Sequence, residues 1–488
     1  MKMIKMALLG GAAMAVSAAG AQADDLDALK AQIETLNARV AAMETAPAVP
    51  AGYALVAISE GDLPQTPGLE MSARDKAAYG NKATVISVLP TADAPAGTTI
   101  VWSGFARAGL VYETTNVDGS AKAYDNVDGE WVRRTDDNDA NTFEGFDVSN
   151  DDDDIDVKAR GQLRVNASTD TAVGEVGVDI RLRANFNGNG AGDVYSDVAW
   201  GYWAMTPEVT FGGGYAGSLG NIGYGYDGAC TCQYTDNADV AFDPGDVTQM
   251  RLAYGSGPFS MALAVEDASI RQGGDNFNAE DKINGDQLGA AGEIKYSGDT
   301  FSGEISGVWR GVDDDEYTAT GYTLGDLGID ALWQVGAGVG FGLGDIANLS
   351  IAAAMGEGPF FTETDGNIVD GVPYNQSWWG VSALASMNLS DEIHAELAAG
   401  YKNREGDDFS LTDEDDLTWE SDGVEYETYA VMGGLYYDPV DQLTIGLEAE
   451  WYTTSTEFEL VDKEKTQKIS ADRDADTFSV DLVSVWRF

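Results

Sequence analysis

The chain has 488 residues, 44% of them hydrophobic and 23% charged, which is enough apolar material for a large folded body. Its 28 Lys and Arg stand against 82 Asp and Glu, and the net charge of −54 argues against a nucleic-acid binder, because phosphate binding needs basic surface. One histidine, His394, and two cysteines disfavour His-based catalysis, Cys/His zinc sites and haem ligation, so we expect no enzyme. The 59 glycines and 10% aromatic residues favour a β protein.

Residues 1–23 have the pattern of a secretory signal peptide. Lys2 and Lys5 precede an apolar run, and Ala21-Gln22-Ala23 forms a small-x-small cleavage site. The run is shorter than the ~20 residues that a membrane-spanning helix needs, and no longer apolar stretch follows. An exported chain of this kind is periplasmic, secreted, or inserted in the outer membrane as a closed barrel.

Residues 24–46 predict a periplasmic coiled coil. Apolar residues recur at alternating steps of three and four, namely Leu26, Leu29, Ile33, Leu36, Val40 and Met43. This stripe needs partner helices or, alternatively, another part of the same chain to cover it, and it is too short to fix the number of helices. Pro47 and Pro50 end the helix, and residues 47–99 form either a linker or a small periplasmic segment.

Residues 100–488 change to strict alternation of apolar and polar side chains, the period of a strand with two different faces. Leu163 and Ile180 fall on one face, for example, while Arg164 and Arg181 fall on the other. Seven short turns, at 169–174, 206–207, 255–258, 297–300, 344–348, 390–392 and 438–442, alternate with long acidic segments that include 113–155 and 453–475. Seven hairpins with one strand before and one after predict an all-β fold, a 16-stranded antiparallel transmembrane β-barrel with its charged face inward.

A soluble β-sandwich or propeller is the alternative fold. Aromatic residues near the predicted strand ends favour the barrel, because a barrel places amphipathic rings in girdles at the two membrane interfaces. These residues are Trp102, Tyr112, Trp200, Tyr202, Tyr215, Tyr296, Trp309, Trp333, Trp378, Tyr436 and Trp451.

From residue 100 onward the chain resembles the general porins of Gram-negative outer membranes, in particular the alphaproteobacterial type. The resemblance rests on the segments TIVWSGFARAGLVYE, DVKARGQLRVNASTDTAVGEVGVDIRLRAN and VAWGYWAMTPEVTFGGGYAGSLG, and on the C-terminal VSVWRF. It implies a homotrimer in outer-membrane lipid and lipopolysaccharide, with a third long loop folded into the lumen. The coiled coil and residues 47–99 depart from the family pattern.

Inward-facing charges predict a basic wall in the lumen, formed by Arg107, Lys158, Arg160, Arg164, Arg181 and Arg183. Because like charges opposite each other on neighbouring strands destabilise a sheet, something anionic should face them. The third loop supplies acidic residues, and the resemblance places it opposite this wall: Asp227, Asp236, Asp239, Asp243 and Asp246. We expect a transverse field at a constriction, in which hydrated solutes pass and apolar ones are disfavoured. The alternative is that the arginines only solvate a wide lumen.

Two further sets of residues, a cysteine pair and a run of aspartates, suggest local chemistry. Cys230 and Cys232 lie in an oxidising compartment, which favours a disulfide, although two free thiols or a metal contact stay open. Acidic loops can hold Ca²⁺ or Mg²⁺ through carboxylates, with Asp151, Asp152, Asp153 and Asp154 as candidate ligands. A solvated acidic surface explains the same residues without a metal.

The sequence therefore predicts an outer-membrane porin for passive diffusion of small hydrophilic solutes and ions, with its coiled coil in the periplasm. The alternative is a structural outer-membrane anchor, in which the coiled coil binds the cell wall and peptidoglycan is the partner.

Overall fold

A computed structural model describes the chain at residues 55–89, 97–134, 145–187, 194–235, 240–267, 288–311, 318–319, 322–324, 331–344, 346–359, 375–406, 409–412 and 418–488. The predicted signal peptide and the predicted coiled coil lie outside these residues. The described chain falls into two compact units, of which one contains residues 58–86 and 99–488 and the other the short remaining parts of 55–98. Among the described residues, no helix is long and apolar enough to cross a membrane.

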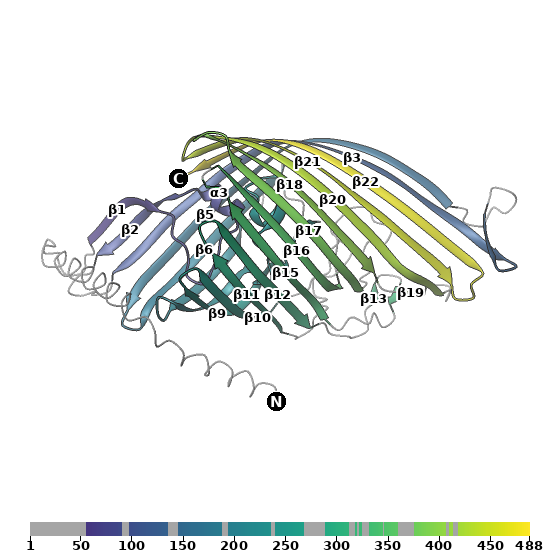
Figure 1. Cartoon of the computed structure of the whole chain (residues 1–488), viewed down its shortest axis with the longest axis horizontal. Helices are drawn as coiled ribbons and strands as arrows, with labels where there is room; N and C mark the ends of the chain where they lie inside the picture. Colours follow the sequence, from purple (N-terminus) through teal and green to yellow (C-terminus); the bar gives the residue numbers. More distant parts are fainter. Residues whose placement is uncertain are drawn as a thin grey trace, which may run out of the picture. The chain divides into compact units, whose positions relative to one another are not determined.

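The large unit is a closed barrel of sixteen antiparallel strands, as the alternation predicts (Figure 1). Each strand pairs with the next one along the barrel, and the last pairs with the first, so that no sheet edge is left. The barrel strands are β3 (Thr98–Val127), β5 (Gly145–Thr171), β6 (Gly174–Asn187), β7 (Val194–Ala204), β8 (Val209–Gly217), β9 (Asp246–Ser256), β10 (Phe259–Asp267), β11 (Gly289–Ser297), β12 (Phe301–Gly311), β15 (Ala331–Gly342), β16 (Ala347–Pro359), β17 (Asn375–Asn388), β18 (Ile393–Gly406), β20 (Thr418–Val440), β21 (Leu443–Asp462) and β22 (Gln467–Arg487).

The two faces of these strands differ as the sequence predicts. Leu263 is 71% exposed on the outside of β10, whereas its neighbours Ala262 and Ala264 point inward and are buried. Large apolar side chains are exposed in the same way on all sides of the barrel, while inward positions carry buried charges such as Arg164 and Glu448. The exposed side chains thus form an apolar outer surface, which water would not stabilise.

The girdle prediction is wrong for four aromatic residues. Trp200, Tyr202, Trp378 and Tyr436 point inward and are 2–5% exposed. They fill space between the barrel wall and the segments inside it; Trp378, for instance, stacks on Phe242 with ring centroids 6.2 Å apart. Among the other predicted girdle residues, Trp102, Tyr112, Tyr215, Trp309 and Trp451 are exposed on the outer surface.

All seven predicted short turns join consecutive barrel strands at one rim. The prediction of a long loop at 453–475 is wrong, because β21 and β22 continue as one hairpin that turns only at residues 463–466. The Asp462 carboxylate closes this turn by accepting hydrogen bonds from the backbone N–H groups of Thr466 and Gln467, at 2.5 and 2.6 Å. The expected loop at 113–155 likewise contains the ends of β3 and β5 and the short strand β4 (Glu130–Arg133). Three further short strands, β13 (Thr318–Ala319), β14 (Tyr322–Leu324) and β19 (Phe409–Thr412), lie between barrel strands.

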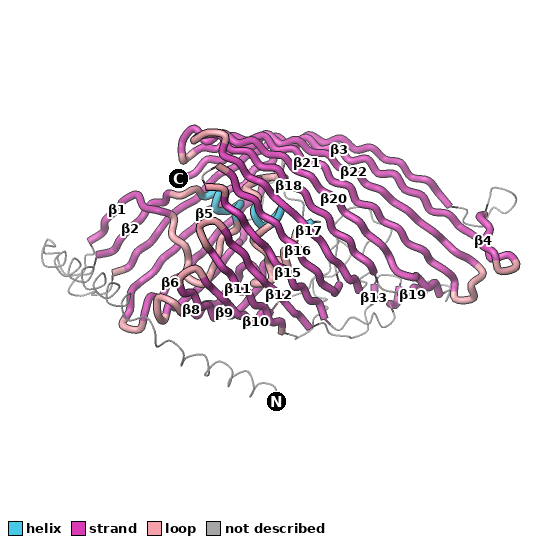
Figure 2. The backbone as a smooth tube through the Cα atoms, viewed as in Figure 1, coloured by secondary structure: helices cyan, strands magenta, loops and turns pink. Residues whose placement is uncertain are grey.

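The segment before the barrel, which the sequence left unassigned, is folded. Strand β1 (Leu55–Asp62) pairs with β2 (Lys82–Leu89), and helix α3 (Ala73–Tyr79) lies between them. The Ser72 side chain caps α3 by accepting from the Asp75 N–H at 3.1 Å, and Gly80 ends it with a φ of 72°, which favours glycine. A second short helix, α4 (Gly225–Ala229), belongs to the loop after β8. Figure 2 shows both helices in cyan among the strands.

Candidate functional site: the lumen of the barrel

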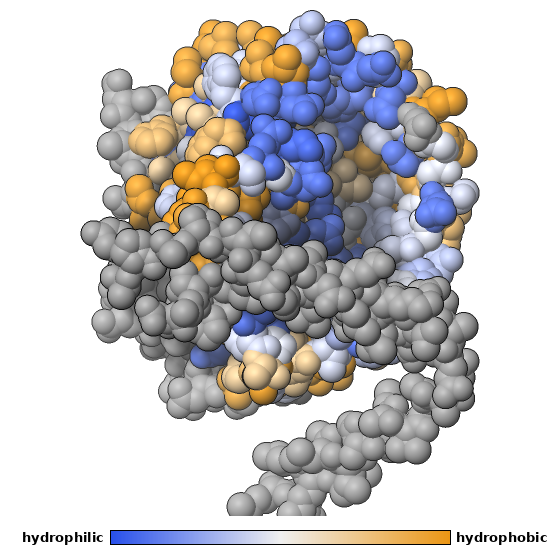
Figure 3. Space-filling view, turned by 90° about the vertical axis from the view of Figure 1, so that its left-hand side faces the viewer, coloured by the Kyte–Doolittle hydropathy of each residue, from blue (hydrophilic) through white to orange (hydrophobic). Residues whose placement is uncertain are grey.

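The inside of the barrel is the candidate site that the inward charges define. Viewed from one end, the molecule has a hollow lined by hydrophilic residues, with hydrophobic residues on its outer surface (Figure 3). Two segments occupy part of this hollow. One is residues 63–81, called here the lumen segment. The other consists of the described residues 218–235 and 240–245 of the loop after β8, called here L3.

The six residues of the predicted basic wall lie on β3, β5 and β6, and two of the arginines share a buried ionic network. Arg164 on β5 stands directly opposite Arg181 on β6. Between them lies Asp179, which accepts from Arg164 at 2.8 Å and is 3.7 Å from Arg181. Arg164 and Asp179 are 1% and 0% exposed, so the pair is held away from water. The negative charge of Asp179 therefore offsets the repulsion between the two facing arginines, for which the sequence had indicated that an anion is needed.

The other basic positions lie on the same wall but in different surroundings. Arg183 pairs with Asp197 at 2.9 Å. Arg160 donates to Asn185 at 2.6 Å, and Lys158 is half-buried next to it on β5. Arg107 on β3 donates to Gln233 of L3 at 3.1 Å.

The same Arg107 guanidinium lies 4.6 Å from the centre of the Tyr234 ring in L3. Burial raises the pKa of Tyr234, and the neighbouring Arg107 and Arg160 charges oppose that rise. Tyr234 therefore stays neutral and packs as an aromatic ring on the cation.

The lumen segment is bound across the inside of several strands. The Thr66 hydroxyl donates to Asp179 at 2.5 Å and accepts from Arg164 at 2.9 Å. Asp75 pairs with Arg181 at 3.1 Å, and Glu70 pairs with Lys295 on β11 at 2.7 Å.

Backbone and apolar contacts complete this attachment. Arg251 on β9 donates to the Gly68 carbonyl at 2.9 Å, and Arg487 on β22 donates to the carbonyls of Ala77 and Ala78. Tyr79 packs edge-on against Phe105, with ring centroids 5.1 Å apart, in a buried cluster. Strands from both sides of the β3–β22 closure thus contact one short segment.

L3 is held by acidic side chains of three other strands, β12, β18 and β21. Glu448 on β21 accepts hydrogen bonds from the backbone N–H groups of Gln233 and Thr235, at 2.7 and 3.2 Å, and from that of Tyr234. Glu396 on β18 accepts from the Thr231 N–H and hydroxyl, and Glu304 on β12 accepts from the Gly223 N–H. These three glutamates are buried, with exposed fractions of only 0–6%, so they hold the loop and do not face open water.

Small inward-facing residues make room for L3. Gly338 and Gly340 on β15 lie under Tyr224, and Gly380 and Gly400 lie under Phe242 and Val240. A Cβ at Gly338 would come within 2.5 Å of the Tyr224 side chain, so any larger residue would displace the loop. The run of Gly, Ala and Ser at alternate positions in β15–β18 is the sequence signal for this docking face, which the sequence analysis missed.

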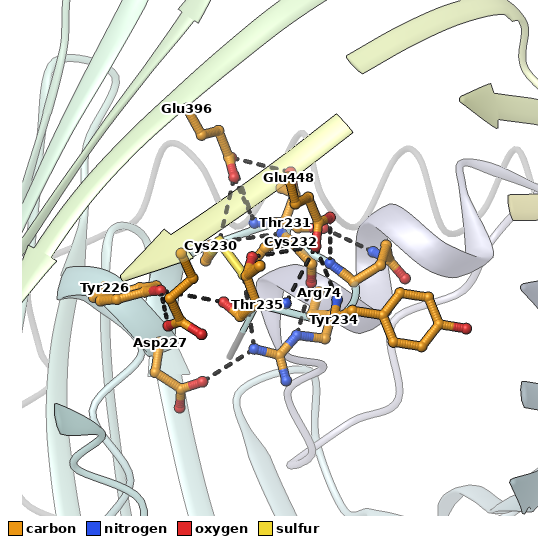
Figure 4. Close-up of a disulfide and its surroundings, with 12 residues drawn as sticks. Arg74, Tyr226, Asp227, Cys230, Thr231, Cys232, Tyr234, Thr235, Glu396 and Glu448 are labelled. Atoms are coloured by element: carbon orange, nitrogen blue, oxygen red, sulfur yellow. Dashed lines mark hydrogen bonds and ion pairs between the residues drawn. A yellow bond between two sulfur atoms is a disulfide. The ribbon is translucent and has the colours of Figure 1, made fainter. Parts of the chain in front are cut away.

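Arg74 joins the two inner segments (Figure 4). From α3 of the lumen segment it donates to the Cys232 carbonyl at 2.8 Å and pairs with Asp227 of L3 at 3.1 Å. Cys230 and Cys232 form a disulfide in the buried core of L3. The role of Arg74 could not be predicted from the sequence, because its partners lie more than 150 residues away.

Three of the wall arginines have partners other than the acidic residues of L3. Arg164, Arg181 and Arg183 pair with Asp179, Asp75 and Asp197. In L3, Asp227 pairs with Arg74, while Asp246 is the first residue of β9. Asp236 and Asp239 lie outside the described residues.

Of the two aspartates of L3 that the structure describes, Asp243 is exposed and Asp227 is half-buried. The pKa of Asp243 is raised to about 6, because the side chain, although open to the lumen, is surrounded by the barrel wall, and because Asp227 adds a like charge.

The proposed metal ligands Asp151–Asp154 follow one another along β5, so their side chains alternate between its two faces. In the described parts of the chain, no group of three or more His, Cys, Asp or Glu is placed to hold a metal ion. A Ca²⁺ or Mg²⁺ site on the acidic loops thus stays a prediction.

No family model and no curated protein sequence matches the chain. Among solved structures it is similar to a loop-deletion variant of OmpT, an outer membrane protein of Vibrio cholerae, at 12% identity and a TM-score of 0.45, over 80% of this chain and 99% of that one. It is also similar to the outer membrane channel DcaP of Acinetobacter baumannii (13%, 0.45, 80% and 97%) and to a porin refined at 1.8 Å resolution (13%, 0.40, 80% and 100%). Identities and TM-scores this low decide nothing about activity, so the function has to come from the residues themselves.

Proposed function

We propose that the chain is an outer-membrane porin, a water-filled channel through which small hydrophilic solutes and ions diffuse passively. The observation that carries this proposal is the closed sixteen-stranded barrel, polar inside and apolar outside. A closed barrel satisfies every backbone hydrogen bond within hydrocarbon, and a barrel of 16–18 strands is wide enough to leave an aqueous lumen. An exposed apolar surface on all sides fits lipid and does not fit water.

L3 narrows this channel in our proposal. Its backbone is tied to Glu304, Glu396 and Glu448 around the inner wall, so it occupies part of the lumen at a fixed place. Asp227 and Asp243 then lie beside the remaining passage. Together with the net charge of −54, they favour cations at low salt.

The proposal places the barrel in the outer membrane of a Gram-negative bacterium, in contact with lipid and lipopolysaccharide, as a homotrimer with its coiled coil in the periplasm. Trimerisation would cover part of the exposed apolar surface. No cofactor and no reaction enter the proposal, since its function is passage through the lumen.

Planar bilayer recordings on the refolded full-length chain test the proposal. We expect open channels that insert in steps of three and a reversal potential that shows cation preference in a salt gradient. A folded barrel that never conducts, and that sediments with peptidoglycan, would overturn the porin and support the anchor.

Glu448→Gln tests the role of L3. An amide cannot accept as many N–H groups as a carboxylate, so L3 should loosen and the open-channel current should become noisier and larger. Glu459→Gln is the matched control, because Glu459 lies on the same strand but pairs only at the exposed end of the hairpin, with Lys468. Equal noise in both variants would contradict a constriction by L3.

A further inference from the structure

The lumen segment has no place in the porin pattern that the sequence resembles, yet it makes some of the most buried polar contacts of the barrel. Its backbone and side chains contact β5, β6, β9, β11 and β22 from within. A linker that only led to the first barrel strand would need none of these contacts.

We propose that residues 63–81 are a second constriction element, which sets the size limit of the channel together with L3. This inference rests on the proposed porin function. The lumen segment adds its own width to the wall.

The contacts with wall cations show how firmly the segment is held inside the barrel. It binds Arg181 through Asp75, and Arg164 through Thr66 and the Pro64 carbonyl. It binds Arg251 and Lys295 through the Gly68 carbonyl and Glu70 in the same way. Without it, Arg164 would keep Asp179, and Lys295 would keep Glu293 and Glu304. The segment's own two acidic and two basic side chains balance, so its main effect on the channel is the width that it occupies.

Arg74 fixes the segment relative to L3. Its ion pair with Asp227 and its bond to the Cys232 carbonyl join the two inner elements at one point, shown in Figure 4. The channel that remains is therefore bounded by two segments attached to each other, and a change in one should be felt at the other.

The water-exposed side of the lumen segment carries the residues that would meet a solute. Glu70, Ser72 and Lys76 are exposed, whereas Thr66, Ala78 and Tyr79 face the wall and are buried. Lys76 lies on α3, and the backbone of α3 is held at Ala77 and Ala78 by Arg487.

Thiol modification in bilayers tests the inference on folded protein. Lys76→Cys would present a thiol on α3, while the two native cysteines are joined and buried. We expect a bulky, charged, water-soluble thiol reagent to lower the single-channel current of this variant by roughly half, since current scales with the open cross-section. Lys82→Cys is the matched control, an exposed lysine at the start of β2 that pairs with Asp62, and its current should not change.

A second variant replaces residues 63–81 by a Gly/Ser linker of equal length. We expect its conductance to rise by roughly twofold and larger polyethylene glycols to enter. Unchanged current after Lys76→Cys modification overturns the inference, whether or not the linker variant folds. If the wild-type chain itself does not conduct, the proposed function fails first, so the two failures can be told apart.

Discussion

The buried ion pair between Arg164 and Asp179 gives the sharpest test of how the wall is built. Asp179→Asn keeps the shape of the side chain but removes its charge. Arg164 and Arg181 are directly opposite each other, and after the change Arg164 would keep only neutral partners. Because both members of the pair are 0–1% exposed, water cannot replace the lost charge.

Removing one partner of a buried pair typically costs about 3–5 kcal/mol of unfolding free energy, and we expect that range for Asp179→Asn and for Arg164→Met. The double variant should lose less than the sum of the two, with a coupling of about 2 kcal/mol, since it leaves no unpaired charge at this position. Reversible urea unfolding in lipid vesicles, followed by tryptophan fluorescence, measures all four free energies.

The control is Lys468 with Glu459, which are 2.7 Å apart but 17% and 47% exposed on the side chain. Exposed pairs of this kind contribute about 0–1 kcal/mol, so Lys468→Met and Glu459→Gln should be nearly additive and small. If the Arg164–Asp179 cycle shows no more coupling than this surface pair, the buried network does not stabilise the wall as we argue.

Three further predictions concern L3 and the outer surface. Lowering the pH from 7 to 5 should reduce cation preference, because the raised pKa of Asp243, about 6, means that its charge is lost in this window; Asp243→Asn should flatten that part of the reversal-potential profile. Gly225→Ala should displace L3 and make the current noisy, because Gly225 has a φ of 76° and its Cβ would collide with Ser382 on β17, whereas Gly433→Ala, with open space, should leave the current unchanged. Leu263→Arg should destabilise the barrel in lipid by about 2–4 kcal/mol in vesicle unfolding, since it lies mid-strand on the outer face; a change near zero would contradict the membrane position.

The strands and their two faces could be predicted because a barrel repeats one simple rule, the alternation of outward and inward side chains. The same alternation also indicates which aromatic residues point inward, and the prediction of an aromatic girdle did not take this into account. Trp378 is buried and Trp379 is 49% exposed, so adjacent tryptophans serve opposite faces. Trp378 has the parity of Gly380 and Ser382, which face the lumen, and this parity was readable in the sequence.

The arrangement inside the lumen could not be predicted, because its contacts join residues that are far apart in the chain. Thr66 and Asp179 are 113 residues apart, and Arg74 and Cys232 are 158 apart. No local period marks such partners. The sequence indicated that the wall arginines need anions, and the resemblance suggested the third loop as their source. Arg164, Arg181 and Arg183 pair instead with Asp75 and with two aspartates of the wall itself.

Inward charges in this barrel therefore have two different roles, one structural and one electrostatic, and an experiment has to separate the two. Arg164 and Glu448 are buried and hold the lumen segment and L3, so neutralising either changes the shape of the channel as well as its charge. Lys158 is half-buried on β5, the same strand as Arg164, so its neutralisation changes chiefly the charge. A shift in selectivity without a change in conductance is expected for Lys158→Gln, and a change in both for Arg164→Gln. If the two variants behave alike, burial does not divide the wall charges into structural and electrostatic groups.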